Sequence, residues 1–290
     1  MQKAATVIVA ATMVFSTGAT AEILEPGPYV SCVTDNGVTV NWITNTATAV
    51  NAVEYGTTAA YGSSVPSYQD MAAEEDTGTY YVHSARITGL SASATYYYRV
   101  VSDAYTSDNE GAGWTVATFP AVGTQDFSFV VYGDSRYAGE SNTHLLWHEK
   151  VMRGVSKEPV PLILHGGDAI SRTDRLIEWS GSHPSSGDPQ GEFFRIAGGR
   201  FKVMQSKWIA VCKGNHELMG DYPTLYGKVF ENPYSGNGLG VNASEDYFAF
   251  DYANARIIFL RHNGSEGFRA FSGFICSIHS GASSSGTRWE

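Results

Sequence analysis

The chain is poor in cysteine, in basic residues and in long apolar runs. Its 290 residues include only three cysteines, Cys32, Cys212 and Cys276, from which neither a disulfide framework nor a thiolate metal site can be read. Lysine and arginine number 19 against 29 aspartates and glutamates, which gives a net charge of −10. An acidic chain without a basic run is a poor candidate for binding a nucleic-acid backbone. Beyond the N-terminal region no segment is apolar enough to span a membrane.

The first 21 residues have the pattern of a secretory signal peptide. Lys3 precedes an apolar stretch from Ala4 to Phe15, and Ala19-Thr20-Ala21 provides an A-x-A end. The apolar stretch is too short for a membrane-spanning helix, and a buried N-terminal strand is the less favoured alternative. We therefore expect cleavage after Ala21, a mature chain that begins at Glu22, and a secreted or periplasmic location.

Residues 22–122 have the pattern of an all-β domain. The segments GVTVNWIT, TAVNAVEYG, TYYVHSARITGL and ATYYYRVVSD alternate in polarity or are β-branched, and turn residues separate them. Short strands at this spacing predict a β-sandwich, with Trp42 in its core. Leu90 stands six residues before Tyr96, which resembles the tyrosine corner of fibronectin-type-III-like sandwiches.

The run Tyr96-Tyr97-Tyr98 admits two interpretations. It could offer an aromatic platform for a carbohydrate. Alternation along a strand, however, puts Tyr96 and Tyr98 on one face and Tyr97 on the other, so core packing is favoured.

Residues 123–261 follow a linker at Phe119–Gly123 and have a different pattern. FSFVVYGDSR, PLILHGGDAI and WIAVCKG predict three buried strands, and YFAFDYANARIIFL predicts a hairpin. Helices are expected from about Asn142 to Val155 and within EFFRIAGGRFKVM. Apolar strands that alternate with helices predict an α/β domain with a parallel-rich sheet and helices on both faces. Residues 262–290 are rich in Ser and Gly, and we expect an aberrant or disordered tail there.

Three of the predicted strands end on polar side chains, Asp134, Asp168 and Asn215, each preceded by a glycine. Groups just past the carboxyl ends of parallel strands meet in one crevice. Two neighbouring carboxylates repel each other unless a cation lies between them. A single Gly-Asp is common in turns, but three such strand ends in order favour a site for two metal ions, a recurring arrangement for phosphoester hydrolysis.

The chain resembles a metallophosphoesterase of the purple acid phosphatase type, a calcineurin-like phosphoesterase with a fibronectin-like N-terminal domain. EPGPYV, VVYGDSR, LHGGDAI, KGNHE, FENP and YFAFDYANARIIFL occur in the expected order over roughly residues 25–260. The resemblance implies that Asp134 binds a first metal ion, that Asp168 bridges both ions and that Asn215 binds the second, the ions being Fe, Mn or Zn. It implies that His216 steadies the transition state or protonates the leaving oxygen, and that Glu217 supports the ligands rather than binding metal.

The chain departs from this pattern at several positions. Arg136 stands where related enzymes often have histidine, and it could clamp a phosphate oxygen or pair with a carboxylate. Ser171 replaces the tyrosine of purple acid phosphatases, so we expect no purple colour. His148 lies on the predicted inner stripe of its helix with Val151 and Val155, which favours a packed histidine over an additional ligand.

The late histidine ligands of the family are missing, because the chain has no Gly-His-x-His and its only later histidines are His262 and His279. His279, in FICSIHSGASSSG, is a weak candidate ligand, and a solvated tail is favoured there. The sequence thus predicts an exported phosphoester hydrolase for a monoester, a diester or a nucleotide, with an incomplete site. The alternative is a non-catalytic secreted binding or surface protein with a degenerate hydrolase domain.

The break in pattern after Leu260 leads to a prediction about the gene. The resemblance leads us to expect Asp-Thr, whereas the chain has Arg261-His262-Asn263, and 12 of the 28 residues in 263–290 are Ser or Gly. Arg-His-Asn can be encoded CGA-CAC-AAC, which read one base later gives GAC-ACA, or Asp-Thr. We predict a frameshift after Leu260, to be checked by resequencing and by translating the other frame. The absence of Gly-His-x-His from that frame, or strong two-metal activity of the 290-residue chain, would contradict it.

Overall fold

The computed structural model describes residues 22–23, 26–75, 78–136, 143–170, 192–218, 225–230, 232, 247–261 and 272–278. The predictions for the signal peptide, Ser171, His262 and His279 lie outside these residues.

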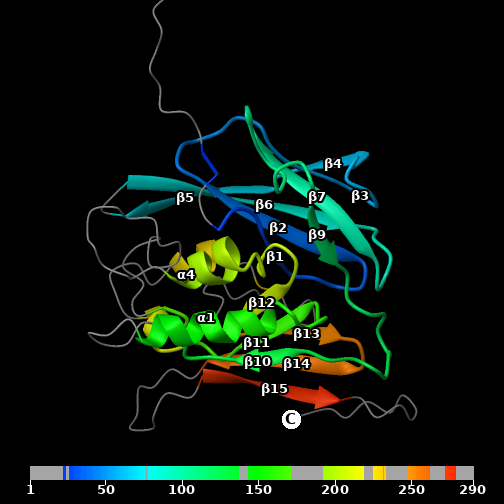
Figure 1. Ribbon diagram of the computed structural model, residues 1–290, viewed down its shortest axis with the longest axis vertical. Coiled ribbons are helices and arrows are strands. Elements are labelled where there is room, and N and C mark those ends of the chain that lie inside the picture. The colour runs from blue at the N-terminus through cyan, green and yellow to red at the C-terminus, as the bar shows by residue number, and fades with distance from the viewer. Residues whose placement is uncertain are drawn as a thin grey trace, which may run out of the picture.

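The first part of the chain forms two antiparallel sheets that face each other (Figure 1). One sheet has the order β1-β2-β6-β5, and the other has the order β4-β3-β7-β8 with β9 also paired to β7. The predicted β-sandwich is therefore confirmed. Its strands are β1 Tyr29–Ser31, β2 Gly37–Thr44, β3 Asn51–Gly56, β4 Ser63–Pro66, β5 Gln69–Glu75, β6 Gly78–Thr88, β7 Thr95–Ser102, β8 Tyr105–Ser107 and β9 Trp114–Ala117.

Aromatic side chains fill the sandwich as the alternation predicted. Trp42 is fully buried, and its indole N–H donates to Ser102 Oγ of the opposite sheet at 2.7 Å. The tyrosine corner is present, because the backbone N–H of Ser91 donates to the hydroxyl oxygen of Tyr96 at 3.0 Å. Tyr98 is fully buried in the same core. The tyrosine run thus serves packing.

The second part contains a parallel sheet in the order β10-β11-β12. The register places Tyr132, His165 and Val211 side by side at the carboxyl ends of the three strands. No helix in the described ranges is long and apolar enough to cross a bilayer. The elements are β10 Val130–Tyr132, α1 Thr143–Val155, β11 Leu162–His165, α3 Glu192–Phe194, the π-helix η1 Arg195–Arg200, β12 Trp208–Val211, the 3₁₀ turn η2 His216–Leu218 and α4 Leu225–Val229.

The two faces of the parallel sheet pack against different layers. Ile163 and Ile209 belong to the core that includes α1 and η1, whereas Leu162 and Leu164 belong to the core that includes the C-terminal hairpin. Within the described residues, helices therefore cover one face and antiparallel strands the other. The prediction of helices on both faces was wrong for these residues, because a second sheet can bury the same apolar strand face.

Helix α1 presents a slightly different stripe from the predicted one. His148, Met152 and Val155 are buried, whereas Val151 is 39% exposed. The spacing of four and three residues keeps His148 on the inner face as predicted. Val151 lies off that face, so its place in the predicted stripe was wrong.

The predicted hairpin forms β13 Phe248–Tyr252 and β14 Ala255–Arg261, and a third strand, β15 Ser272–Ile278, pairs antiparallel with the whole of β14. Figure 1 shows β15 in red at the outer edge of this sheet. Residues 272–278 of the expected aberrant or disordered tail are thus an ordered strand, and whether the tail is aberrant stays a prediction. The physical reason is that β14 would otherwise be an open edge, and the apolar segment SGFICSI can pair with it.

The sandwich and the second part share buried contacts. The backbone N–H of Val30 in β1 donates to Met204 O at 2.9 Å. The hydroxyl of Tyr98 donates to Gln205 O at 2.7 Å, and Gln205 Nε2 in turn donates to Pro26 O at 2.6 Å. Phe119, at the end of the sandwich, stacks on Trp208 of β12 with ring centroids 6.1 Å apart. These contacts fix the parallel sheet against the sandwich.

Replacing Tyr98 by phenylalanine should destabilise the full chain by about 1–3 kcal/mol, because the buried Gln205 carbonyl loses its hydroxyl donor. The matched control is Tyr97→Phe, a partly exposed neighbour on the other face of the same strand, which should change stability by no more than about 0.5 kcal/mol. Urea unfolding of the three proteins checks this. Equal effects of the two substitutions would contradict the role given to the Tyr98 hydroxyl.

Candidate active site

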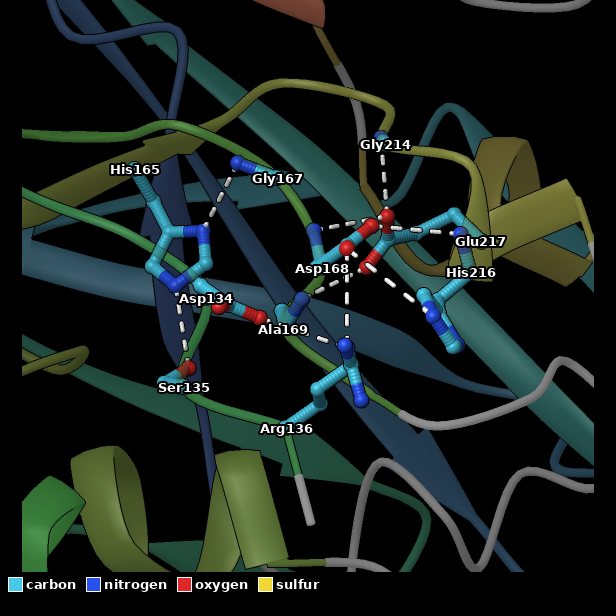
Figure 2. Close-up of polar contacts among 10 residues, drawn as sticks. All are labelled: Asp134, Ser135, Arg136, His165, Gly167, Asp168, Ala169, Gly214, His216 and Glu217. Atoms are coloured by element: carbon cyan, nitrogen blue, oxygen red, sulfur yellow. Dashed lines mark hydrogen bonds and ion pairs between the residues drawn. The ribbon is translucent and has the colours of Figure 1, made fainter. Parts of the chain in front are cut away.

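Polar side chains gather just past the aligned ends of β10, β11 and β12 (Figure 2). Asp134 lies two residues past Tyr132, and Asp168 lies three residues past His165. The loops are joined by backbone hydrogen bonds, because Asp134 N–H donates to Gly167 O and Arg136 N–H donates to Asp168 O, both at 3.0 Å. The convergence expected from the parallel strands is therefore present for the first two aspartates.

Both aspartates adopt the left-handed backbone region that favours glycine, with φ of +52° at Asp134 and +54° at Asp168. Aspartate tolerates this region better than most residues, but it remains sparsely populated. Strained residues persist only where their surroundings hold them, and they cluster at functional sites. Asp134 and Asp168 are two of ten non-glycine residues with positive φ in the described chain, and they lie just past the ends of β10 and β11, where sequence analysis placed the carboxylate ligands.

Close approach of two backbones explains the glycines before Asp168 and Asn215. A Cβ on Gly214 would lie 2.2 Å from Asp168 Oδ1 and 2.6 Å from Asp168 N. A Cβ on Gly167, which has φ of +98°, would lie 2.9 Å from Gly214 N. Only glycine allows these loops to touch, so the glycines serve contact between loops as well as the turn predicted from the sequence.

Glu217 ties the β11 and β12 loops together. Its side chain is fully buried, and its carboxylate accepts three backbone N–H groups, from Asp168 at 3.0 Å, Ala169 at 2.7 Å and Gly214 at 2.8 Å. Burial raises the pKa of Glu217 to about 7, although the three N–H donors oppose that shift. The side chain thus supports the Asp168 loop from within the protein.

The Asp168 carboxylate lies within reach of two basic side chains. Arg136 Nε is 3.5 Å from Asp168 Oδ2 and 3.2 Å from Asp134 Oδ1. His216 Nε2 is 4.0 Å from Asp168 Oδ2, and the His216 backbone N–H donates to Asp168 Oδ1 at 3.2 Å. Of the two roles considered for Arg136, pairing with carboxylates is the one that these distances show.

The remaining predicted site residues are placed differently. Asn215 follows Gly214 and is exposed at the end of β12. His148 is buried between the rings of Tyr132 and Phe193, with centroids 5.9 and 5.6 Å away, and its Nε2 has no hydrogen-bond partner among the residues that the structure describes. Burial lowers the pKa of His148 to about 4, so the ring is neutral at pH 7. His148 is a packed histidine, as favoured, and His279 lies outside the described residues.

One buried histidine beside the site was missed. His165, the last residue of β11, is bonded to Gly167 and Ser135 in the loops that carry the two aspartates. The sequence signal was available, since a histidine ends an otherwise apolar strand directly before Gly-Gly-Asp. Among the described residues, no group of three or more His, Cys, Asp or Glu side chains is arranged to hold a metal ion.

We predict that Glu217→Gln destabilises the chain, because an amide cannot accept all three N–H groups and each orphaned donor costs about 1–3 kcal/mol. The raised pKa makes the Glu217 contribution largest below about pH 4.5, and it falls as pH rises through about 7. The stability difference between wild type and variant should therefore shrink from pH 4.5 to pH 7, as followed by urea unfolding.

Glu54→Gln, which affects the part-exposed pair with Arg99, is the control and should show no such trend. A pH-independent difference for Glu217→Gln would contradict the assignment.

Comparison with known proteins bears on the sandwich. A search of curated sequences gave no significant match. Among solved structures, a cyclomaltodextrinase has a TM-score of 0.24 and 12% identity and covers 48% of this chain and 31% of its own. An amylomaltase from Corynebacterium glutamicum has a TM-score of 0.24 and 12% identity over 49% of this chain and 21% of its own. These likenesses are too weak to inform the fold.

Residues 27–117, however, match the family model of the purple acid phosphatase N-terminal domain, which assigns the sandwich to that domain type.

Proposed function

We propose that the chain is an exported metal-dependent phosphoester hydrolase whose catalytic part follows the sandwich. The observation that carries the proposal is the Asp168 carboxylate, which adjoins Asp134 through Arg136 and also adjoins His216 (Figure 2). Carboxylate, guanidinium and imidazole groups from three strand ends provide cation ligands, an anion-binding group and a proton donor in one place. The phosphatase-type sandwich supports the same reaction class.

The donor set fits a hard cation. Asp134 and Asp168 provide carboxylate oxygens, and Asn215 follows the glycine whose backbone touches Asp168. Among the ions that the resemblance implies, Fe, Mn and Zn, oxygen donors of this kind suit Mn²⁺ best. Among the described residues no group of three or more His, Cys, Asp or Glu side chains is arranged to hold such an ion, so the two aspartates and Asn215 would need further ligands to enclose one. A bound cation would supply Lewis-acid stabilisation of charge on the phosphoryl oxygens.

The chain's own residues have separate tasks in this proposal. His216, whose side chain is 19% exposed beside Asp168, would give a proton to the departing alcohol oxygen. Arg136 holds a positive charge beside both carboxylates and can turn that charge toward a phosphate oxygen. The Asp134 side chain is 74% exposed, so a phosphoester can reach this edge of the sheet from solvent.

A second candidate function is a non-catalytic secreted binding protein. It is favoured by the small number of potential ligands among the described residues and by a family match that is confined to the sandwich. On this alternative, Asp134, Asp168 and His216 are the remnant of a catalytic site, and the sandwich carries the binding activity.

The experiment compares metal content and hydrolysis of p-nitrophenyl phosphate and its diester in the full chain and in variants. Asp168→Ala should lower bound metal and activity together. His216→Ala should keep metal and lower turnover by about 10²–10⁴-fold. Arg136→Gln should raise KM more than it lowers kcat. Asp251→Ala, which affects an exposed aspartate paired with Arg256, is the control and should change neither quantity.

Unchanged metal content in Asp168→Ala would contradict the assignment of Asp168 as a metal ligand. Loss of metal in His216→Ala would indicate that His216 itself binds the metal ion. A wild-type chain without metal-dependent hydrolysis would favour the binding protein.

A further inference from the structure

His165, unlike the other buried histidines of the described chain, contacts the two loops that carry Asp134 and Asp168. It is fully buried at the end of β11. Its Nδ1 lies 3.2 Å from the backbone N of Gly167, and its Nε2 lies 3.0 Å from Ser135 Oγ. Gly167 precedes Asp168, and Ser135 follows Asp134. One ring therefore contacts both loops that carry the candidate carboxylate ligands, as Figure 2 shows.

The hydrogen bonds fix the tautomer of this ring. A backbone N–H can only donate, so Nδ1 of His165 accepts from Gly167 and carries no proton. The proton of the neutral ring then resides on Nε2, which donates to Ser135 Oγ. Burial, with a contribution from His148, lowers the pKa of His165 to about 3, so the ring stays neutral over the physiological range.

The ring plane is held by its neighbours. Tyr132 contacts it edge-on with centroids 4.5 Å apart, and Phe193 contacts it edge-on at 5.4 Å. A rotation of the imidazole would break both of its hydrogen bonds and these two ring contacts. His165 is thus a rigid spacer between Ser135 and Gly167.

The spacer acts where the backbone is under strain. Asp134 and Asp168 both have positive φ, and the backbone hydrogen bonds between their loops include those of Asp134 with Gly167 and of Arg136 with Asp168. Strained backbone needs surrounding contacts to keep it in place. Ser135 lies between the two residues that form those bonds, so its side-chain contact with His165 braces this segment.

We propose that His165 is a positioning residue that joins the Asp134 loop to the Asp168 loop and so sets the spacing of the two carboxylates. The link from this spacing to cation binding rests on the proposed function. The bracing of the loops by His165 is independent of the proposed function, because it concerns only contacts between residues of the fold.

The test uses the full chain with His165→Asn and Ser135→Ala, singly and together. Asparagine retains an acceptor for Gly167 and has nothing at the position of Nε2, so both substitutions remove the same contact. Each should raise the hydrogen exchange of the Asp134 and Arg136 amides by roughly tenfold, and the double variant should show no further increase. Each should also weaken Mn²⁺ binding, measured by calorimetry, by at least about tenfold.

The matched control is the hydroxyl–imidazole pair in the sandwich, Thr44 Oγ1 and His83 Nε2 at 2.8 Å, in which the histidine is also buried. Thr44→Ala and His83→Asn should change global stability without selective exchange at the Asp134 and Arg136 amides. If His165→Asn fails to fold, Ser135→Ala provides the same test through a smaller change.

Unchanged protection of both amides in Ser135→Ala would overturn the proposal, whatever the Mn²⁺ result. Raised exchange with unchanged Mn²⁺ affinity would overturn the link between loop spacing and cation binding. If the wild-type chain bound no Mn²⁺, the proposed function would fail, and amide exchange alone would decide whether His165 positions the loops.

Discussion

The candidate site depends on one buried carboxylate. Glu217 is removed from water, and an isolated charge in that position would be strongly unfavourable. Three backbone N–H groups from two loops offset part of this cost, although burial still raises the pKa of Glu217 to about 7. The same bonds hold the Asp168 and Gly214 backbones so close that no side chain fits at residue 214. The three hydrogen bonds to Glu217 thereby hold the strained backbone of Asp168 and keep His216 close to Asp168.

A second constraint comes from the contact between the sandwich and the parallel sheet. The larger aromatic core includes Trp42 and Phe119 of the sandwich together with Trp208 of β12 and Phe250 of the hairpin. Phe119 packs edge-on against Tyr252 with centroids 4.6 Å apart. The sandwich and the second part therefore share one hydrophobic core. The strand ends that carry the polar residues are held in place by this packing as well as by their own loops.

Much of this arrangement follows from local sequence patterns. Alternation identified the sandwich, the spacing of Leu90 and Tyr96 identified the tyrosine corner, and apolar runs ending in Gly-Asp identified β10 and β11. What could not be read from the sequence depends on partners distant along the chain. The covering of one sheet face by β13–β15 in place of helices is such a case. So is the role of His165, because its contact with Ser135 joins residues 30 positions apart.

The charges at the site form an asymmetric arrangement around Arg136. Its shorter contact is to Asp134, whose side chain is 74% exposed, and its longer contact is to Asp168, which is 20% exposed. Solvent screens the first pair strongly, so the shorter distance does not make it the stronger interaction. The second pair lies in a less polarisable environment, where a charge interacts more strongly at a given distance. A cation that binds Asp168 therefore competes with the guanidinium chiefly at this carboxylate. Movement of Arg136 away from Asp168 would free its charge for an anionic substrate, so cation binding and phosphate binding at this edge of the sheet are expected to favour each other.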